Sequence, residues 1–483
     1  MSLTEGTGTA SGIEAVRPQP LAGRLKLVLA VLLVAQFMLA VDFSILNVAL
    51  PDIGQGLGIS LGNLQWIATA FALCAGGFTL LFGRIADLFG RRRLFLVGLA
   101  VLGLASVAGG MATSPTMLIT ARVFQGLATA AVTPAGLSLM TTSFPEGPAR
   151  DRALGLNGAL MSAGFTTGAV LGGVLTDLLS WRWAFFINVP VALVVLLIAP
   201  SVIKESRPTT RPRLDLPGAA LVTLGLLALV FGFTQAGRDG WGSVTTLGSL
   251  ALGAALLALF YAVERRQQAP LMPVTVLRRP TVAWGNAAGL LAFLTETSLV
   301  FLLTLYLQKV LGFSPLEAGL SFGVLGLGTV TGGSFAPRIV GRIGTRAALI
   351  AGGVVQAVAT FALLGLSSST GGSLALLLIA TFVGGVGNML VIVGFMITAT
   401  SGLPDHEQGL ATGLATMTQQ IGITMGTPIM SAIATGAMAS SAASAVLHGV
   451  SVAIAVNASL VLLSVVVAAV CLRSPRAAAA PAR

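Results

Sequence analysis

Three ionisable side chains stand inside long apolar stretches of the sequence, where a charge is expensive. Asp42, Arg122 and Glu296 each lie within a run of about 20 or more mostly apolar residues. A carboxyl group in such surroundings can take up or release a proton when its access to water or to a cation changes. The three residues therefore predict proton binding that depends on the arrangement of the surrounding helices.

Asp42 and Arg122 fall at comparable depths in their runs. At 1.5 Å per residue, Asp42 lies about 22 Å from the inner end and about 12 Å from the outer end of its run, and Arg122 lies roughly 9 Å below the outer end. We therefore expect that the two side chains can pair. A permanent ion pair that only fixes helix packing is one interpretation of both residues.

Glu296 lies near the middle of its run, about thirteen residues from one end and about ten from the other. An unpaired carboxylate at the centre of a bilayer is costly, so we expect this group to be protonated in at least one state. Two simpler interpretations stay open. Glu296 could line a water-filled space without any coupling, or it could be a neutral, hydrogen-bonded packing residue.

Composition indicates a membrane protein. The 483 residues are 55% hydrophobic and 9% charged, against about 25% charged in soluble domains. The net charge of +11 could suggest a nucleic acid partner, but the basic residues are distributed by side of the membrane, so we expect lipid and no nucleic acid.

Several chemistries lack their usual residues. No lysine follows a glycine as a phosphate-binding loop requires, and the two histidines and two cysteines are scattered, so we expect no enzyme activity, no metal site, no cofactor and no disulfide framework. Any work would be driven by an ion gradient, the proton motive force, or by a partner.

Hydropathy predicts 14 membrane-spanning helices with both termini in the cytoplasm. With that topology, three basic residues lie outside (Arg182, Arg238 and Lys309), Arg122 lies within a span, and the other 23 of the 27 are cytoplasmic. Positive residues are retained on the cytoplasmic side, so this bias favours an even number of spans.

An internal repeat divides the chain into two halves. Arg84, Gly90 and Arg92 align without gaps with Arg338, Gly344 and Arg346, which predicts two homologous six-helix bundles with two helices inserted between them. We expect the charges of the linkers 204–214 and 264–280 to face water and lipid headgroups. The predicted organisation is a cytoplasmic tail 1–25, a first bundle 26–203, inserted helices with linkers 204–282, a second bundle 283–472 and a tail 473–483.

The charged segment 83–93 separates two apolar runs and contains Gly83, Asp87, Gly90, Arg91 and Arg92. Its glycines allow a tight turn, and its aspartate and arginines could form a two-state ionic latch. These residues resemble the signature of the loop between spans 2 and 3 in the major facilitator superfamily, with Leu88 where that family often has arginine.

Further motifs resemble the drug:proton antiporters of that superfamily that have fourteen spans. The segment Asp42–Pro51 is similar to their first-span motif, with Ser44 in place of threonine, and the segment Ala121–Gly126 is similar to their fourth-span motif. The resemblance implies that Arg122 holds or releases the proton of Asp42.

Small residues form a stripe in the fifth span. Gly164, Gly168 and Gly172 recur every four residues, with Gly173 beside them, and such a stripe lets two helices approach closely. It resembles the antiporter signature of the fifth span, although Ala169 replaces the motif proline, and generic tight packing is the alternative. Two further elements resemble the same group, namely Ser180–Trp183 through Asn188–Pro190 and Gln419–Gly422 with Gly426; we interpret the second as helix packing.

The resemblance implies an all-α integral membrane protein with the major facilitator fold. It implies a monomeric, multi-pass transporter of the cytoplasmic membrane that exports amphipathic drugs or antibiotics, cationic compounds among them, by proton-coupled alternating access. A proton-coupled transporter of another small metabolite, working as exporter or uptake symporter, is the alternative on the same fold. A membrane enzyme or a sensor would need a catalytic cluster or a signalling domain, and the sequence shows neither.

Overall fold

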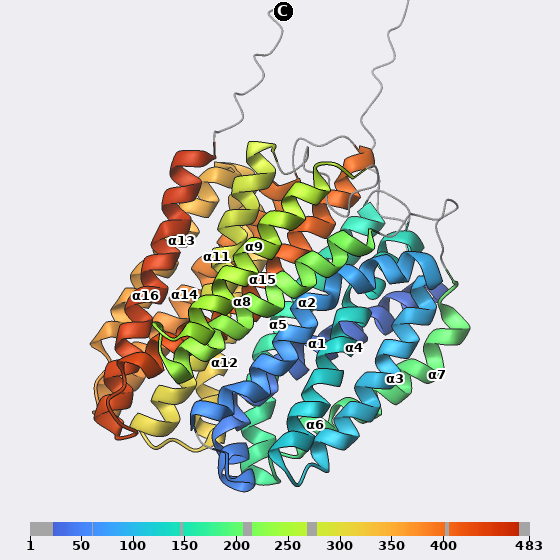
Figure 1. Ribbon diagram of the computed structural model, residues 1–483. Helices are drawn as coiled ribbons and strands as arrows, with labels where there is room; N and C mark the ends of the chain where they lie inside the picture. The colour runs from blue at the N-terminus through green and yellow to red at the C-terminus, as the bar shows by residue number, and fades with distance from the viewer. Residues whose placement is uncertain are drawn as a thin grey trace, which may run out of the picture.

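The computed structural model describes residues 23–59, 61–144, 148–205, 215–267, 278–400 and 405–472. Within these ranges the chain is built from helices that run roughly side by side, as Figure 1 shows. The predicted tails 1–22 and 473–483, and most of the linkers at 206–214 and 268–277, lie outside the described residues.

The helices fall into three groups along the chain. The N-terminal bundle consists of α1 (Gly23–Leu57), α2 (Leu61–Phe89), α3 (Arg91–Gly110), α4 (Pro115–Ser143), α5 (Pro148–Leu178), α6 (Trp183–Phe186) and α7 (Asn188–Val202). The inserted pair is α8 (Leu216–Asp239) and α9 (Val244–Glu264). The C-terminal bundle consists of α11 (Pro280–Leu305), the π-helix η1 (Tyr306–Val310), α12 (Pro315–Ile343), α13 (Thr345–Ala362), the 3₁₀ turn η2 (Leu363–Gly365), α14 (Thr370–Thr400), α15 (Asp405–Ala437) and α16 (Ala443–Cys471).

Helix boundaries follow local capping chemistry. The hydroxyl of Ser114 accepts a hydrogen bond from the backbone N–H of Met117 at 3.3 Å, one residue before the proline that begins α4. Ser314 and Glu317 form a reciprocal capping box at the start of α12. These side chains satisfy N–H groups that have no partner within the helix.

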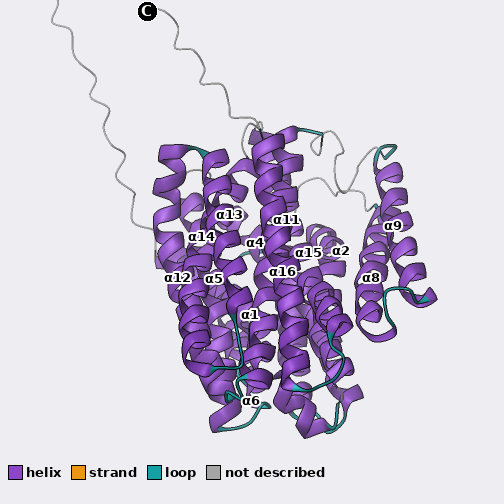
Figure 2. Ribbon diagram, turned by 90° about the vertical axis from the view of Figure 1, so that its left-hand side faces the viewer, coloured by secondary structure: helices purple, strands orange, loops and turns teal. Residues whose placement is uncertain are grey.

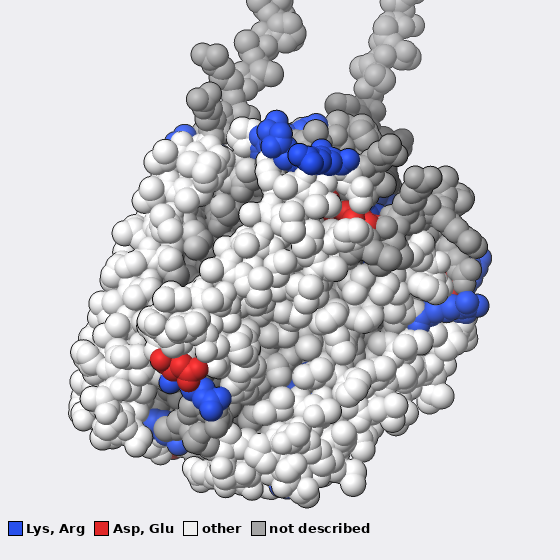
Figure 3. Space-filling view, in the orientation of Figure 1, with Lys and Arg blue, Asp and Glu red and all other residues white. Residues whose placement is uncertain are grey.

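The chain is a multi-pass membrane protein. Among the described residues, twelve stretches are long and apolar enough to cross a membrane. Helices α2 and α15 are not among the twelve, although α2 carries a shorter apolar stretch over Trp66–Thr79, so the count of fourteen spans stays a prediction. Figure 3 shows the outer surface that such helices present: charged atoms form a few small groups, with a wide uncharged surface between them.

The inserted helix α8 contacts both bundles. The hydroxyl of Thr223 donates to the carbonyl of Gly77 in α2 at 2.7 Å, and the hydroxyl of Thr435 in α15 donates to the carbonyl of Gly237 at 3.2 Å. The first contact lies in the first half of α8, at its eighth residue, and the second lies near its end. Figure 2 shows α8 and α9 together beside α2 and α15. Helix α8 is therefore a bridge between the two bundles.

The aligned residues of the internal repeat occupy equivalent places in the two bundles. Gly90 precedes α3 with φ 107°, and Gly344 precedes α13 with φ 83°; both angles lie in the region that favours glycine. Arg92 donates to the carbonyls of Pro200 and Ile203 at 3.2 and 3.0 Å, at the end of α7.

Arg346 likewise donates to a backbone carbonyl at the end of α16, the last helix of the C-terminal bundle. Its guanidinium donates to the carbonyl of Ala469 in α16 at 2.6 Å. Each of the two arginines therefore satisfies carbonyls at the C-terminus of the sixth span of its own bundle, where a cation is favoured by the helix dipole.

One expectation for the first linker is wrong. We expected its charges to be solvated, but Glu205 turns back onto the start of α3. Its Oε1 accepts a hydrogen bond from the backbone N–H of Arg92 at 3.0 Å, and its Oε2 lies 4.0 Å from Nε of Arg93. The first N–H groups of a helix have no partner within the helix and favour a negative charge, which explains the contact.

Candidate functional site

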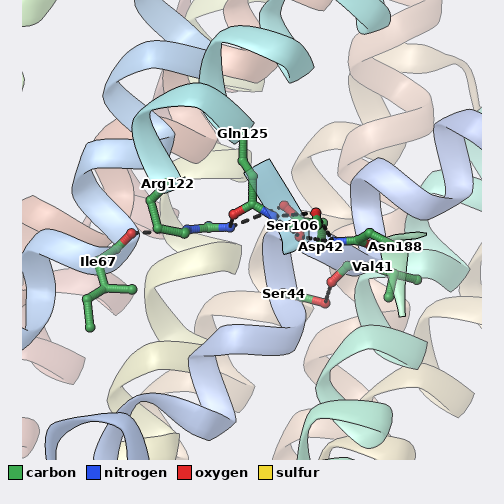
Figure 4. A network of polar contacts seen from close by, with 8 residues as sticks. All are labelled: Val41, Asp42, Ser44, Ile67, Ser106, Arg122, Gln125 and Asn188. Atoms are coloured by element: carbon green, nitrogen blue, oxygen red, sulfur yellow. Dashed lines mark hydrogen bonds and ion pairs between the residues drawn. The ribbon is translucent and has the colours of Figure 1, made fainter. Parts of the chain in front are cut away.

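Asp42 and Arg122 form an ion pair in the interior of the N-terminal bundle. Oδ2 of Asp42 in α1 lies 3.2 Å from Nη1 of Arg122 in α4, and each side chain is only 1% exposed (Figure 4). The pairing that we expected from the shared depth is therefore confirmed. Because both side chains are buried, each charge depends on the other: the removal of either partner leaves an uncompensated buried ion.

Arg122 is fixed on three sides. Its Nε donates to the carbonyl of Ile67 in α2 at 3.2 Å, and its Nη1 also donates to Oε1 of Gln125 at 2.9 Å. The guanidinium lies 4.0 Å from the centre of the Phe71 ring, a distance at which the ring face attracts a cation. Helices α2 and α4 together hold this arginine in place.

Asp42 accepts two further hydrogen bonds, both on Oδ1. One comes from Nε2 of Gln125 at 3.2 Å and the other, a short one, from Nδ2 of Asn188 in α7. The same two amide groups also donate to the hydroxyl of Ser106 in α3, at 2.9 and 3.3 Å. Helices α1, α3, α4 and α7 thus contribute side chains to the network around Asp42. Hydrogen bonds to an ionised carboxylate are stronger than those between neutral groups, so the groups that donate to Asp42 favour its ionised form.

The network borders a cavity that both bundles line. Arg122 and Phe71 form part of a space of about 370 Å³, together with Asn47 of α1 and with Thr424 and Thr427 of α15. Arg122 therefore links the buried pair to a space between the two halves of the protein.

A larger cavity of about 710 Å³ also lies between the bundles. Asn47 lines both spaces, and the larger one is closed by side chains of α1 and α2 on one side and of α11, η1, α15 and α16 on the other. Its lining is mostly apolar, with Lys309 as the single charged residue. Ligand pockets are typically apolar with a few polar groups, so this lining suits an amphipathic molecule.

Glu296 lies apart from the ion pair. It belongs to α11 and lines a third cavity, and the described residues around this cavity all belong to the C-terminal bundle. No ion pair of Glu296 is found within the described part of the chain. The structure therefore brings Asp42 and Arg122 together and places Glu296 in the other bundle.

The glycine stripe of α5 packs against the backbone of α1. A Cβ atom at Gly164 would lie 2.9 Å from the carbonyl oxygen of Phe37, and one at Gly168 would lie 2.6 Å from that of Val41. Gly172 meets the carbonyl of Ile45 in the same way. The predicted close approach of two helices is confirmed, and Gly173 packs against Pro315 of α12 in the other bundle.

Two glycines of α15 repeat this packing against α11. A Cβ atom at Gly422 would lie 2.8 Å from the carbonyl oxygen of Leu290, and Gly426 faces the carbonyl of Leu294. The prediction that these glycines serve helix packing is confirmed. Helices α5 and α15 therefore contact the first helix of their own bundle in the same way, through glycines that face its backbone carbonyls.

The predicted ionic latch is only partly described. The side chain of Asp87 lies outside the described residues, whereas Gly83, Gly90, Arg91 and Arg92 are described. Gly83 faces Pro134 of α4 at an ordinary contact distance of 3.7 Å. The contacts of Arg92 with α7 are structural, and the latch itself stays a prediction.

Sequence reasoning missed several polar neighbours of the carboxyls. Ser106 and Asn188 complete the Asp42 network, and Asn388 lines the Glu296 cavity. Asn188 stands in a segment that resembles the antiporters, which is a signal that could have been followed. Within the described residues, no group of three or more histidine, cysteine or acidic side chains could hold a metal ion.

Residues 32–427 match the family model described as Major Facilitator Superfamily. The chain is 38% identical over 464 residues to the puromycin resistance protein pur8 of Streptomyces alboniger, covering 93% of this chain and 92% of that protein. It is also 38% identical over 400 residues to the cephamycin export protein CmcT of Amycolatopsis lactamdurans, covering 82% of each.

A solved structure has the same fold at low identity. The human organic anion transporter MFSD10 (TETRAN) superposes with a TM-score of 0.60 at 17% identity, covering 93% of this chain and 100% of that chain. This likeness shows the all-helical fold of the superfamily.

Proposed function

Since this chain belongs to the Major Facilitator Superfamily, we propose that it exports amphipathic drugs or antibiotics across the cytoplasmic membrane in exchange for protons. The observation that carries the proposal is the buried pair of Asp42 and Arg122, whose guanidinium also lines a space between the bundles. The names of the relatives, a puromycin resistance protein and a cephamycin export protein, support antibiotics as the substrate class.

The pair provides a way to couple a proton to substrate. Protonation of Asp42 removes the negative partner of Arg122, so the guanidinium loses its ion pair and its other contacts must compensate. Those contacts reach α2 through Ile67 and Phe71. A change of charge at Asp42 is therefore transmitted to the helices that line the substrate space.

Glu296 is the second proton-binding group of the proposal. It lies in the C-terminal bundle, whereas Asp42 lies in the N-terminal bundle, so each half carries one buried carboxyl group. Two bundles that rock about a midplane site can expose such groups to each face of the membrane in turn. We place both termini in the cytoplasm, on the side that carries most of the basic residues.

The energy of one proton is sufficient. A charge that moves through about 100 mV releases about 2.3 kcal/mol, which sustains roughly a fiftyfold concentration ratio of a neutral substrate. We therefore assign no cofactor beyond the proton motive force and no partner beyond substrate, protons and lipid, and we treat the protein as a monomer.

Inverted membrane vesicles test the proposal. Acidification of their lumen should drive accumulation of puromycin or a cephamycin, and Asp42→Asn should reduce that accumulation by about tenfold or more. The matched control is Asp239→Asn, the same change at an exposed carboxyl of α8, which should transport like the unaltered protein.

Two results would count against the proposal. Transport that ignores both the pH difference and the voltage would remove proton coupling. Accumulation only in right-side-out vesicles with an acidic exterior would favour an uptake symporter.

A further inference from the structure

The two spaces between the bundles share one lining residue, Asn47 of α1. Asn47 is 6% exposed, and its side-chain amide makes no hydrogen bond within the described part of the chain. Its amide nitrogen and oxygen are nevertheless not fully buried, whereas both amide atoms of Asn388 are. The amide of Asn47 is therefore open to the two spaces that this residue lines.

The backbone of α1 adds a second polar group at the same residue. Pro51 lies inside α1 and lines the larger space, and proline has no N–H to donate to the carbonyl four residues earlier. The carbonyl of Asn47 therefore lacks its usual helical partner and points along the helix towards Pro51. The next carbonyl, that of Val48, accepts a hydrogen bond from Nε2 of Gln308 in η1 at 2.9 Å, so at this level the α1 backbone faces the other bundle.

Several other polar side chains around the two spaces already donate to the protein. The hydroxyls of Thr304 and Thr435 donate to backbone carbonyls at 2.9 and 2.8 Å, and the hydroxyl of Thr424 donates to the carbonyl of Ala72 at 3.1 Å. Asn47 differs from these threonines because both its side-chain amide and its backbone carbonyl have places left for hydrogen bonds.

The chemistry of Asn47 suits an uncharged group that carries an N–H. A side-chain amide both donates and accepts, and a carbonyl only accepts, so an amide group of a ligand can bond to both. Polar groups that lose water without gaining a partner cost free energy, which favours a ligand that satisfies them. The linings contain no acidic residue, and their charged members, Arg122 and Lys309, are basic, which disfavours a cationic amine.

We propose that Asn47 binds an amide group of the substrate, with apolar parts of the substrate on either side of it in the two spaces. The proposal deepens the proposed function by naming a chemical group of the substrate, and it rests on that function for the statement that these spaces hold the exported compound. An apolar lining discriminates poorly between compounds of similar shape, whereas a site that hydrogen-bonds a substrate N–H rejects an analogue without it.

A pair of uncharged compounds tests the proposal on the purified full-length protein in lipid nanodiscs. N-benzyl-1-naphthamide and benzyl 1-naphthoate differ only in that an ester oxygen replaces the amide N–H. Binding of the tritium-labelled amide is measured with each unlabelled compound as competitor, and empty nanodiscs give the background. We expect the amide to bind about tenfold more tightly than the ester, because the ester leaves the carbonyl of Asn47 without a donor.

Variants assign this preference to Asn47. Asn47→Leu should weaken binding of the amide to the level of the ester and leave binding of the ester nearly unchanged. Pro51→Ala returns an N–H to the carbonyl of Asn47 and should reduce the preference by about threefold or more. The matched controls are Asn388→Leu, at a buried amide outside the two spaces, and Pro337→Ala, at an exposed proline inside α12; both should keep the full preference.

The outcomes separate this inference from the proposed function. Equal binding of amide and ester by the unaltered protein, no saturable binding of the amide, or a preference that Asn47→Leu leaves intact would overturn the role of Asn47. If Asn47→Leu does not fold, the change in Pro51→Ala decides. A preference that depends on Asn47, together with no pH-driven accumulation of drug in inverted vesicles, would uphold the role of Asn47 and overturn proton-coupled export. Drug accumulation with equal binding of amide and ester would do the reverse.

Discussion

Asp42 in the N-terminal bundle is held by an arginine and two amides, whereas Glu296 in the C-terminal bundle lines a cavity that has no basic residue in its lining and that also borders Asn388, an amide without a hydrogen-bond partner within the described residues. The bundles otherwise share their packing. Glycines of α5 contact the backbone of α1, and glycines of α15 contact the backbone of α11. Arg92 and Arg346 each donate to carbonyls at the C-terminus of the last helix of their own bundle. The repeated parts are therefore structural, and the two halves differ where charge is buried.

The largest expected effect comes from the ion pair. Asp42→Asn leaves Arg122 as an uncompensated buried charge, so we expect a loss of about 3–5 kcal/mol in the free energy of unfolding. Thermal unfolding of the purified protein measures it. The double variant Asp42→Leu/Arg122→Met removes both charges and should recover most of the loss. If the single and double variants were equally unstable, the pairing would not be what stabilises this site.

The next largest effect is expected at the glycines of α5 and α15, and it tests whether these two helix contacts are equivalent. Gly168→Ala and Gly426→Ala each place a Cβ atom against the backbone of the facing helix, so both should destabilise the protein by about 1–3 kcal/mol. Gly158→Ala is the matched control, because nothing lies within 4 Å of the position that its Cβ atom would take on α5. That change should be neutral or stabilising by up to about 1 kcal/mol. A marked difference in the loss of unfolding free energy between Gly168→Ala and Gly426→Ala would show that the two helix contacts are not equivalent.

The arginines at the two helix ends should give a smaller effect. Arg92→Ala and Arg346→Ala remove charge-assisted hydrogen bonds to the C-termini of α7 and α16, and each should cost about 1–2 kcal/mol. Unfolding in denaturant, read at a common protein concentration, compares the two directly. Exposed Arg265 at the end of α9 offers a control, since its change to alanine should fall within about 0.5 kcal/mol of zero.

The smallest effect on stability is expected at Glu296. With no cationic partner among the described residues, Glu296→Gln removes the cost of a buried charge, so the free energy of unfolding should stay the same or rise by up to about 1 kcal/mol. Proton-driven efflux should nevertheless fall. A loss of several kcal/mol, similar to that of Asp42→Asn, would mean that Glu296 has a partner in the part of the chain not described, and the contrast between the bundles would vanish.

The sequence allowed one contact between charged residues, that of Asp42 with Arg122, to be predicted because depth along a helix is a single coordinate. Asp42 and Arg122 had similar depths in neighbouring spans, and a buried charge needs an opposite one, so the pairing followed. The periodic glycines of α5 and α15 likewise indicated close helix packing, although they did not indicate that α1 and α11 are the helices contacted.

Neutral polar residues could not be assigned in the same way. Ser106, Asn188 and Asn388 can each satisfy their hydrogen bonds locally or across helices, and the sequence does not indicate the rotation of a helix about its axis. Glu205 was misjudged for a related reason. Its charge suggested water, but the free N–H groups at the start of α3 lie close enough to compete with water for it.

The contacts of helix α8 limit how the inserted pair can behave during transport. Its hydrogen bonds to α2 and α15 are separated by the span from Thr223 to Gly237, roughly 21 Å at the rise of an α-helix. If the two bundles tilt in opposite directions, helix α8 cannot keep its hydrogen bonds to both of them. A hydrogen bond tolerates only a few tenths of an ångström of stretch, and the two bonded points are far apart along the helix. Under the proposed alternating-access cycle, we therefore expect α8 to break its hydrogen bond to one bundle and to move with the other.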